Sequence, residues 1–162
     1  MHELAITNPE KVKAAFLFNP GCLQPFSMSV KNLFANLLPI VSPTSKNVRR
    51  FLDTAIFSKP DHGLSPLAEE LLIDYEVFAL KRYNDRSQKP YFMANELDDV
   101  SVATYLLLGD SDLLFPADKS IRNARIHLKS LCETKVFANV GHGIETYAEA
   151  MVYLGEKIRS FD

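Results

Sequence analysis

The sequence contains few cysteines and no excess of charge of either sign. Its two cysteines, Cys22 and Cys132, are too few for a disulfide framework or a four-ligand zinc site. The 18 Lys and Arg residues against 20 Asp and Glu give a net charge of −2. This balance argues against a nucleic-acid partner and against polybasic contact with a membrane. These absences predict a protein of a reducing compartment that has neither kind of partner.

Long hydrophobic runs are also missing. The longest candidate, residues 102–108, is far shorter than the roughly 20 residues of a membrane span. The first residues show no basic region followed by an apolar stretch, as a secretory signal would. No two histidines share i, i+4 spacing and no H-E-x-x-H motif occurs, so we expect no metal and no other cofactor. The sequence therefore predicts a soluble, cytoplasmic protein.

What is present is a pattern of short apolar runs within a length that suits one domain. Three such runs, without clean alternation, lie at residues 12–18, 102–108 and 135–140. Runs of this kind are typical of strands that are buried on both faces of a parallel sheet. Helical periodicity separates the last two runs and follows the third. The pattern therefore predicts an α/β fold whose parallel strands are joined by right-handed crossovers.

Residues 26–91 are predicted to form a helical insertion. Within it, Ser65 before Pro66 is a good N-cap with proline at the first helical position. The helix that follows is expected to bury one face, made of Leu67, Leu71, Leu72, Tyr75, Phe78 and Ala79. An earlier helix is expected to present a second apolar face, made of Val48, Phe51, Leu52, Ala55 and Ile56.

Helix boundaries are predicted at both ends of the chain. Asp118 is expected to cap a helix that Cys132 closes, and Thr146 with Glu149 to form the capping box of the last helix. Residues 1–8 show helical periodicity with no N-cap before it, and Pro9 cannot continue a helix. The chain is therefore predicted to begin inside a helix.

Two of the predicted strands are followed by side chains that could cooperate in catalysis. Asp112 follows the strand at 102–108, His142 follows the strand at 135–140, and open α/β sheets bind ligands at the carboxyl ends of their strands. A carboxylate that accepts a hydrogen bond from imidazole Nδ1 selects one tautomer, which leaves Nε2 free to take a proton from a nucleophile. We therefore predict that Asp112 and His142 are a catalytic acid and base.

Other residues near these loops are weaker candidates for a catalytic role. Asp110 is an alternative acid, although a residue directly after a strand-ending glycine is expected to stabilise the turn. Cys22 is an alternative nucleophile, although an inert packed cysteine is far more common. Glu145 is a possible second carboxylate near the histidine. Three further histidines are expected on the surface or in turns: His2, His62 and His127.

Three segments resemble the C-terminal half of the α/β-hydrolase superfamily. Residues 107–112 (LLGDSD) with Phe115 and Pro116 resemble the family's strand, G-x-x-D acid turn and proline-started helix. Residues 139–142 (NVGH) resemble its histidine loop, and residues 8–13 (NPEKVK) resemble the stretch after its nucleophile helix. The resemblance implies that Asp112 is the acid and His142 the general base of a Ser-His-Asp triad, in a protein similar to bacterial carboxylesterases.

The same resemblance implies a division of the chain and a missing group. Residues 1–25 would end the helix after the nucleophile and form the first strand, 26–91 would be a helical cap, and 92–162 would carry the acid and histidine loops. The family's serine lies in a G-x-S-x-G motif, which this sequence lacks; residues 63–67 (GLSPL) come nearest but have no second glycine. The serine and the oxyanion loop are expected upstream of Met1, so we expect the full enzyme to act on a small-molecule ester and this chain alone to be inactive.

Two other functions remain open at this point. The chain could be a non-catalytic binding module that associates through an unpaired edge of the strand at 12–18. It could also belong to a dehalogenase or an epoxide hydrolase, whose chemistry on the same scaffold needs an aspartate in place of the serine.

Overall fold

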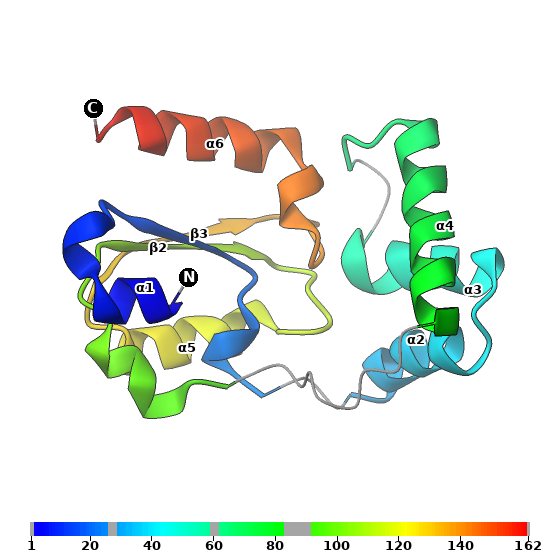
Figure 1. Ribbon diagram of the computed structural model, residues 1–162, viewed down its shortest axis with the longest axis horizontal. Helices are drawn as coiled ribbons and strands as arrows, with labels where there is room; N and C mark the ends of the chain where they lie inside the picture. The colour runs from blue at the N-terminus through cyan, green and yellow to red at the C-terminus, as the bar shows by residue number, and fades with distance from the viewer. Residues whose placement is uncertain (1, 26–28, 59–61, 83–91, 162) are drawn as a thin grey trace.

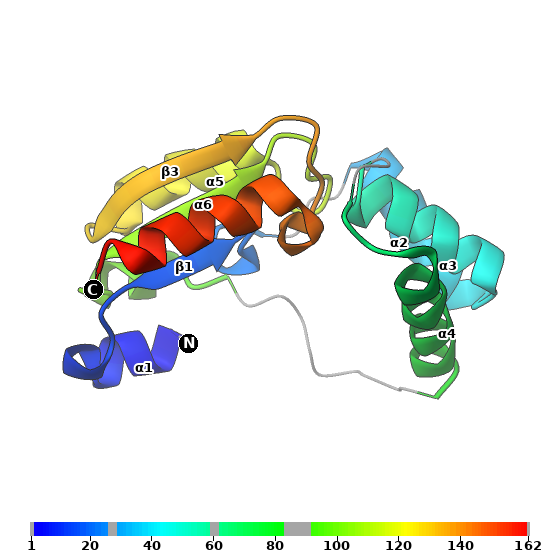
Figure 2. The same cartoon turned by 90° about the horizontal axis from the view of Figure 1, so that it is seen from above.

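The computed structural model describes residues 2–25, 29–58, 62–82 and 92–161, and its centre is a parallel sheet of three strands. The strands β1 (Ala15–Phe18), β2 (Thr104–Gly109) and β3 (Leu131–Phe137) lie in the order β1-β2-β3. Helix α6 (Ala148–Arg159) covers one face of the sheet, and α1 (His2–Thr7) and α5 (Ala117–His127) lie on the other (Figures 1 and 2). The predicted α/β class with parallel strands is therefore confirmed.

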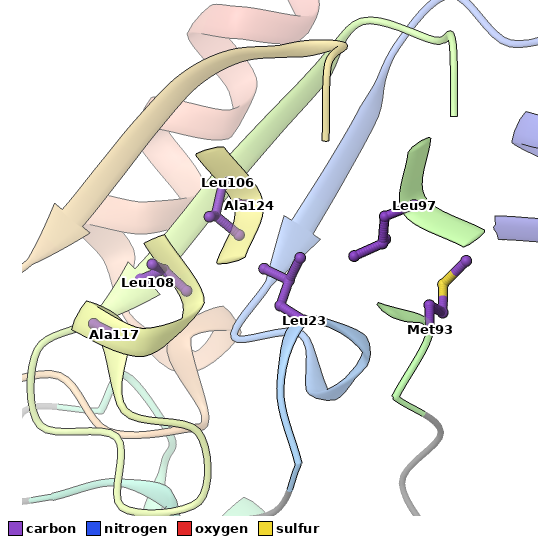
Figure 3. Close-up of a cluster of buried hydrophobic side chains, with 7 residues drawn as sticks. All are labelled: Leu23, Met93, Leu97, Leu106, Leu108, Ala117 and Ala124. Atoms are coloured by element: carbon purple, nitrogen blue, oxygen red, sulfur yellow. The ribbon is translucent and has the colours of Figure 1, made fainter. Parts of the chain in front are cut away.

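The central strand organises the core on both faces of the sheet. Leu106 and Leu108 point toward α5 and pack with Leu23, Met93, Leu97, Ala117 and Ala124 (Figure 3). Leu107 points the other way and packs with the α6 side, including Phe137, Ile144 and Tyr147. All three leucines are fully buried. A central strand that is covered on both faces needs no polar alternation, which explains the apolar run in the sequence.

The strand ends differ from the prediction, most of all in β3. This strand starts at Leu131 rather than at Lys135, and Phe137 is its one fully buried residue. Because β3 lies at the edge of the sheet and carries Glu133 and Lys135, it shows no apolar run at its start. The prediction that Cys132 closes a helix is wrong: Cys132 is exposed and lies in β3.

One of the three predicted helix caps is confirmed. Ser65 Oγ accepts a hydrogen bond from the Ala68 amide, 3.2 Å away, at the start of α4 (Pro66–Arg82). Asp118 does not cap α5, because Pro116 is the N-cap and Asp118 lies within the first turn. The Thr146–Glu149 capping box is also wrong: Tyr147 is the N-cap of α6, and the Thr146 hydroxyl donates to the Gly143 carbonyl. A short 3-10 turn, η5 (Ile144–Thr146), uses that hydroxyl instead.

The chain between β1 and β2 includes a group of helices beside the carboxyl edge of the sheet (Figures 1 and 2). It contains α2 (Val30–Val41), α3 (Ser45–Phe51), the π-helical turn η3 (Leu52–Ile56) and α4. These helices surround a small core of Val48, Leu52, Phe57 and Ile73. Both ends of the predicted insertion, at Phe26 and Tyr91, lie outside the described residues, so its boundaries stay predictions.

The predicted inner face of α4 is wrong for four of its six residues, whereas Leu72 and Ala79 are partly buried. Leu67, Leu71, Tyr75 and Phe78 are between 53% and 76% exposed. The helix instead buries Ile73, with Leu72, Val77 and Leu80 packed beside it. Several apolar residues share a helical spacing along α4, and only the packing against α3 decides which stripe is covered. None of the described helices is both long and apolar enough to cross a bilayer.

Candidate active site

Three loops meet at the carboxyl edge of the sheet, on the side of the helical group (Figure 2). They follow β1 at Asn19, β2 at Asp110 and β3 at Ala138. Because the strands are parallel, all three loops leave the sheet at the same edge. The topology therefore places the acid loop and the histidine loop side by side.

The Asp112 carboxylate is fully enclosed and held at both oxygens. Its Oδ1 accepts hydrogen bonds from the amides of Leu114, at 2.8 Å, and Phe115, at 3.0 Å. Its Oδ2 lies 2.9 Å from His142 Nδ1. The side chain of Asp112 has no exposed surface, whereas that of His142 is 29% exposed. The two backbone donors thus aim one carboxylate oxygen at the imidazole.

The same contact determines which nitrogen of the histidine ring carries the hydrogen. An ionised carboxylate can only accept hydrogen bonds, so Nδ1 must carry the hydrogen that joins it to Asp112. In the neutral ring, Nε2 is then unprotonated and can accept a proton. The ring of Phe115 lies 5.6 Å from the imidazole, centre to centre. This arrangement suits a general base whose tautomer and orientation are set by a buried carboxylate.

The histidine loop is bonded to the end of the helical group. The amide of Gly143 donates to the Ile56 carbonyl at 2.8 Å, and the Gly63 amide donates to the Thr146 carbonyl at 2.6 Å. The Tyr147 hydroxyl donates to the Phe57 carbonyl. A Cβ atom at Gly141 would lie 2.4 Å from the Ile56 carbonyl oxygen, so only glycine fits this approach. The helices are therefore joined to the loop that carries His142, a connection that no local sequence pattern indicates.

Sequence reasoning missed one buried polar residue of the site, Asn19. The side chain of Asn19 in fact lies between the acid and histidine loops and contacts Gly109, Gly141 and His142. An asparagine directly at the end of a buried strand was the available signal, because asparagine tolerates the left-handed backbone that such turns need.

The weaker candidates lie away from the imidazole or have other partners. Asp110 Oδ1 accepts hydrogen bonds from the Ser111 hydroxyl and the Asn139 amide, so Asp110 links the two loops as a turn residue. Glu145 is exposed on η5. Among the described residues, Asp112 is the carboxylate that pairs with His142.

The other histidines have mixed environments. His62 lies in the loop before α4 and is half-buried: its ring lies 4.2 Å from that of Phe57, centre to centre, and its Nδ1 finds no hydrogen-bond partner in the described part of the chain. His127 Nδ1 lies 3.9 Å from Asp98 Oδ1. The side chain of His2 lies outside the described residues. Among those that are described, no group of three or more His, Cys, Asp or Glu could hold a metal ion.

Cys22 is a core residue rather than a site residue. It lies in the 3-10 turn η2 (Gly21–Leu23) and packs on the core cluster beneath the sheet, near Leu23 and Met93. Burial raises the pKa of the Cys22 thiol, so the thiol stays protonated. A protonated, packed thiol is a poor nucleophile.

This difference predicts two rates of thiol modification. With a disulfide reagent at pH 8, exposed Cys132 should react first and Cys22 at least about tenfold more slowly. The variants Cys22→Ser and Cys132→Ser assign the two phases. Equal rates, or faster modification of Cys22, would show that the Cys22 thiol is activated and would support Cys22 as the nucleophile.

The fold and the Asp–His pair together define the class of this chain: it has the C-terminal part of the α/β-hydrolase fold. No protein-family model and no curated protein sequence matches it. Among solved structures, it is similar to a Bacillus subtilis protein described in general terms as a hydrolase, with a TM-score of 0.72 and 22% identity. It is also similar to two Bacillus subtilis enzymes, carboxylesterase CesB (TM-score 0.66, 18% identity) and naproxen esterase, carboxylesterase NP (0.67, 21%).

These similarities extend over the whole chain but over only part of the other proteins. Each of the three structures matches 99% of this chain. The chain in turn covers 55%, 54% and 54% of them, so it spans about half the length of the structures that it matches. The expected resemblance to α/β-hydrolases is confirmed at the level of the fold.

Proposed function

We propose that this chain carries the acid–base pair of a carboxylic-ester hydrolase, with His142 as general base and Asp112 as the residue that orients it. The observation that carries this proposal is the 2.9 Å contact between Asp112 Oδ2 and His142 Nδ1 at the carboxyl edge of a parallel sheet. Ligands bind at that edge in open α/β folds. The similarity to esterase structures supports the ester as substrate class.

In the proposed reaction, a serine hydroxyl attacks the ester carbonyl while His142 Nε2 takes its proton. The imidazolium then gives that proton to the departing alcohol, which leaves an acyl-serine. His142 next takes a proton from water, which attacks the acyl group and releases the carboxylic acid. Throughout, the buried Asp112 carboxylate stabilises the imidazolium that forms. The partly exposed face of His142 is where the serine and the substrate meet it.

The 162 residues contain no G-x-S-x-G motif, the nucleophile elbow that carries the serine of this scheme. We propose that the serine and the oxyanion loop come from outside these residues, as the half-length match allows. Residues 26–91 then serve as the cap that shapes the pocket for a small ester. An aspartate at the same elbow would instead support dehalogenase or epoxide-hydrolase chemistry.

Two measurements test this proposal. Purified chain should not react with a serine-directed fluorophosphonate, because the proposal places the activated serine outside these residues. The control variant is Ser58→Ala: Ser58 has a left-handed backbone, φ 53°, and directly follows Phe57, which packs against Gly141. Stoichiometric labelling would show that the nucleophile lies within the chain and would contradict its external origin. Loss of that labelling in Ser58→Ala would identify Ser58 as the nucleophile.

The second measurement is the DNA sequence upstream of the Met1 codon. We expect it to encode G-x-S-x-G in one of the reading frames, and the extended protein to hydrolyse short p-nitrophenyl esters. An encoded G-x-D-x-G would favour aspartate chemistry. The absence of either motif in every frame would contradict the hydrolase proposal.

One observation favours a second candidate, a non-catalytic module that binds a partner through its sheet. Strand β1 pairs only with β2 among the described strands, so its other edge has free backbone groups. Such an edge can accept another strand. A chain that dimerises reversibly with rising concentration, and whose upstream DNA encodes no elbow, would support this candidate over the hydrolase.

A further inference from the structure

We infer that Asn19 is a positioning residue: one buried side chain at the end of β1 holds the Asp112 loop and the His142 loop in the register that joins the acid to the base. This inference rests on the proposed function for its catalytic meaning. The contacts themselves are a property of the chain and can be tested without any activity.

The side-chain amide of Asn19 reaches both loops at once. Its Oδ1 accepts a hydrogen bond from the Gly109 amide at 2.9 Å, at the start of the acid turn. Its Nδ2 donates to the carbonyls of Gly141, at 2.9 Å, and His142, at 2.8 Å. Both amide hydrogens are therefore used, and the oxygen has a partner as well. The last of these bonds holds the backbone of the proposed base itself.

The position of Asn19 makes this set of bonds stiff. The residue is 1% exposed, and its own backbone amide donates to the Leu107 carbonyl at 3.0 Å, which extends the β1–β2 pairing by one step. Its φ of 38° lies in the left-handed region. Asparagine tolerates this region better than most residues, and glycine would tolerate it without supplying any side-chain bond.

The partners of Asn19 explain why it affects the pair and not only the fold. Gly109 begins the turn whose third following residue is Asp112, and the Asp112 amide donates back to the Gly109 carbonyl at 3.4 Å. Asp112 in turn meets His142 through one oxygen only. Both loops are held by the same amide group of Asn19, so its loss would allow either loop to shift. A small shift of either loop would lengthen the single contact between Asp112 and His142.

A purely structural role and a positioning role predict different results. Loss of packing alone would lower stability and leave the Asp112–His142 contact unchanged. Loss of positioning would release the His142 ring, so that neutral imidazole no longer keeps its hydrogen on Nδ1. The tautomer of His142 therefore distinguishes the two roles, and it can be read directly by NMR.

The experiment uses the full 162-residue chain, labelled with ¹⁵N. Long-range ¹⁵N–¹H correlation spectra are recorded at a pH high enough for the imidazoles to be neutral. The His142 signals are assigned with the variant His142→Ala. The test variants are Asn19→Gly, which keeps the left-handed backbone and removes the side chain, and Asn19→Asp, which keeps the size but loses the amide donors. The matched control is Asn139→Gly, because Asn139 also has a left-handed backbone, φ 60°, but an exposed side chain.

In the parent chain and in Asn139→Gly, we expect the Nδ1–H form to exceed the Nε2–H form by more than about tenfold, as a hydrogen bond to a charged group sustains. In both Asn19 variants, the populations of the Nδ1–H and Nε2–H forms should differ by no more than about threefold. Circular dichroism should still show the native helix content. The use of two variants keeps the test valid if one of them does not fold.

Two results would overturn the inference. Folded Asn19 variants that keep the parent ratio would reduce Asn19 to a structural residue, and so would an equal fall in Asn139→Gly. A parent chain without an excess of the Nδ1–H form would be a different failure. It would refute the Asp112–His142 pair, and with it the proposed function, before Asn19 is considered.

Discussion

Asp112→Asn is expected to lower ester hydrolysis about 10,000-fold in the active hydrolase that we propose. The reason lies in the two backbone amides of Leu114 and Phe115, which both donate to Asp112 Oδ1. In the variant, the carboxamide oxygen must stay at that position to accept them. The amide nitrogen then faces His142 Nδ1 and donates to it, which forces the hydrogen of the neutral ring onto Nε2. A histidine with hydrogen on Nε2 cannot take a proton from serine.

The matched control for this change is Asp110→Asn. Asp110 lies in the same turn, but it is exposed and its Oδ1 accepts from Ser111 and Asn139 rather than from the imidazole. We expect a change in activity of no more than about threefold. NMR of the chain alone adds a second readout, since Asp112→Asn should invert the tautomer of His142 and Asp110→Asn should not. Equal losses of activity in the two variants, or an unchanged tautomer in Asp112→Asn, would contradict the assignment of Asp112.

Gly109→Ala is expected to destabilise the chain by about 3 kcal/mol. A Cβ atom at this position would lie 2.2 Å from the Val140 carbonyl oxygen and 2.6 Å from that of Gly141. Both contacts are with backbone atoms, which cannot rotate away as a side chain can. The histidine loop must therefore move away from the end of β2, and the hydrogen bond from the Gly109 amide to Asn19 is strained at the same time.

Gly155→Ala is the control with the opposite sign. Gly155 lies inside α6, and a Cβ atom there would meet only the guanidinium of Arg159, at 3.6 Å. Alanine in a helix interior is more stable than glycine by roughly 0.5–1 kcal/mol, so this variant should be stabilised. Urea unfolding followed by circular dichroism measures both changes. A neutral or stabilising Gly109→Ala would show that the histidine loop is not packed against Gly109 as described.

Part of this structure is predictable from short stretches of sequence. The apolar run of β2 predicts a buried central strand because leucines on both faces are covered by helices. Ser65 before Pro66 predicts a helix start, because a cap needs only the side chain and the amide three residues later. Asp112 and His142 are predictable because each follows a strand of a parallel sheet, and that position depends only on the order of the elements.

The failed predictions involve residues whose environment is set by distant parts of the chain. The caps at Asp118 and Thr146 had the right residue types, but neighbouring turns placed the helix starts elsewhere. The stripe of Leu67 and Leu71 on α4 had helical spacing, but the packing of α3 covers the side of Ile73 instead. Among the described strands, β3 has a neighbour on one side only, which leaves room for its charged residues.

By itself, the sequence determined the α/β class, the order of the strands along the chain, and the two residues that end up paired at the sheet edge. It could do so because apolar runs, turn residues and caps act over a few positions. Only the tertiary structure decided how these parts meet. Asn19 lies 90 positions from Gly109 and 122 from Gly141, and Asp112 lies 30 positions from His142. Such contacts depend on packing across the sheet, which no local pattern records.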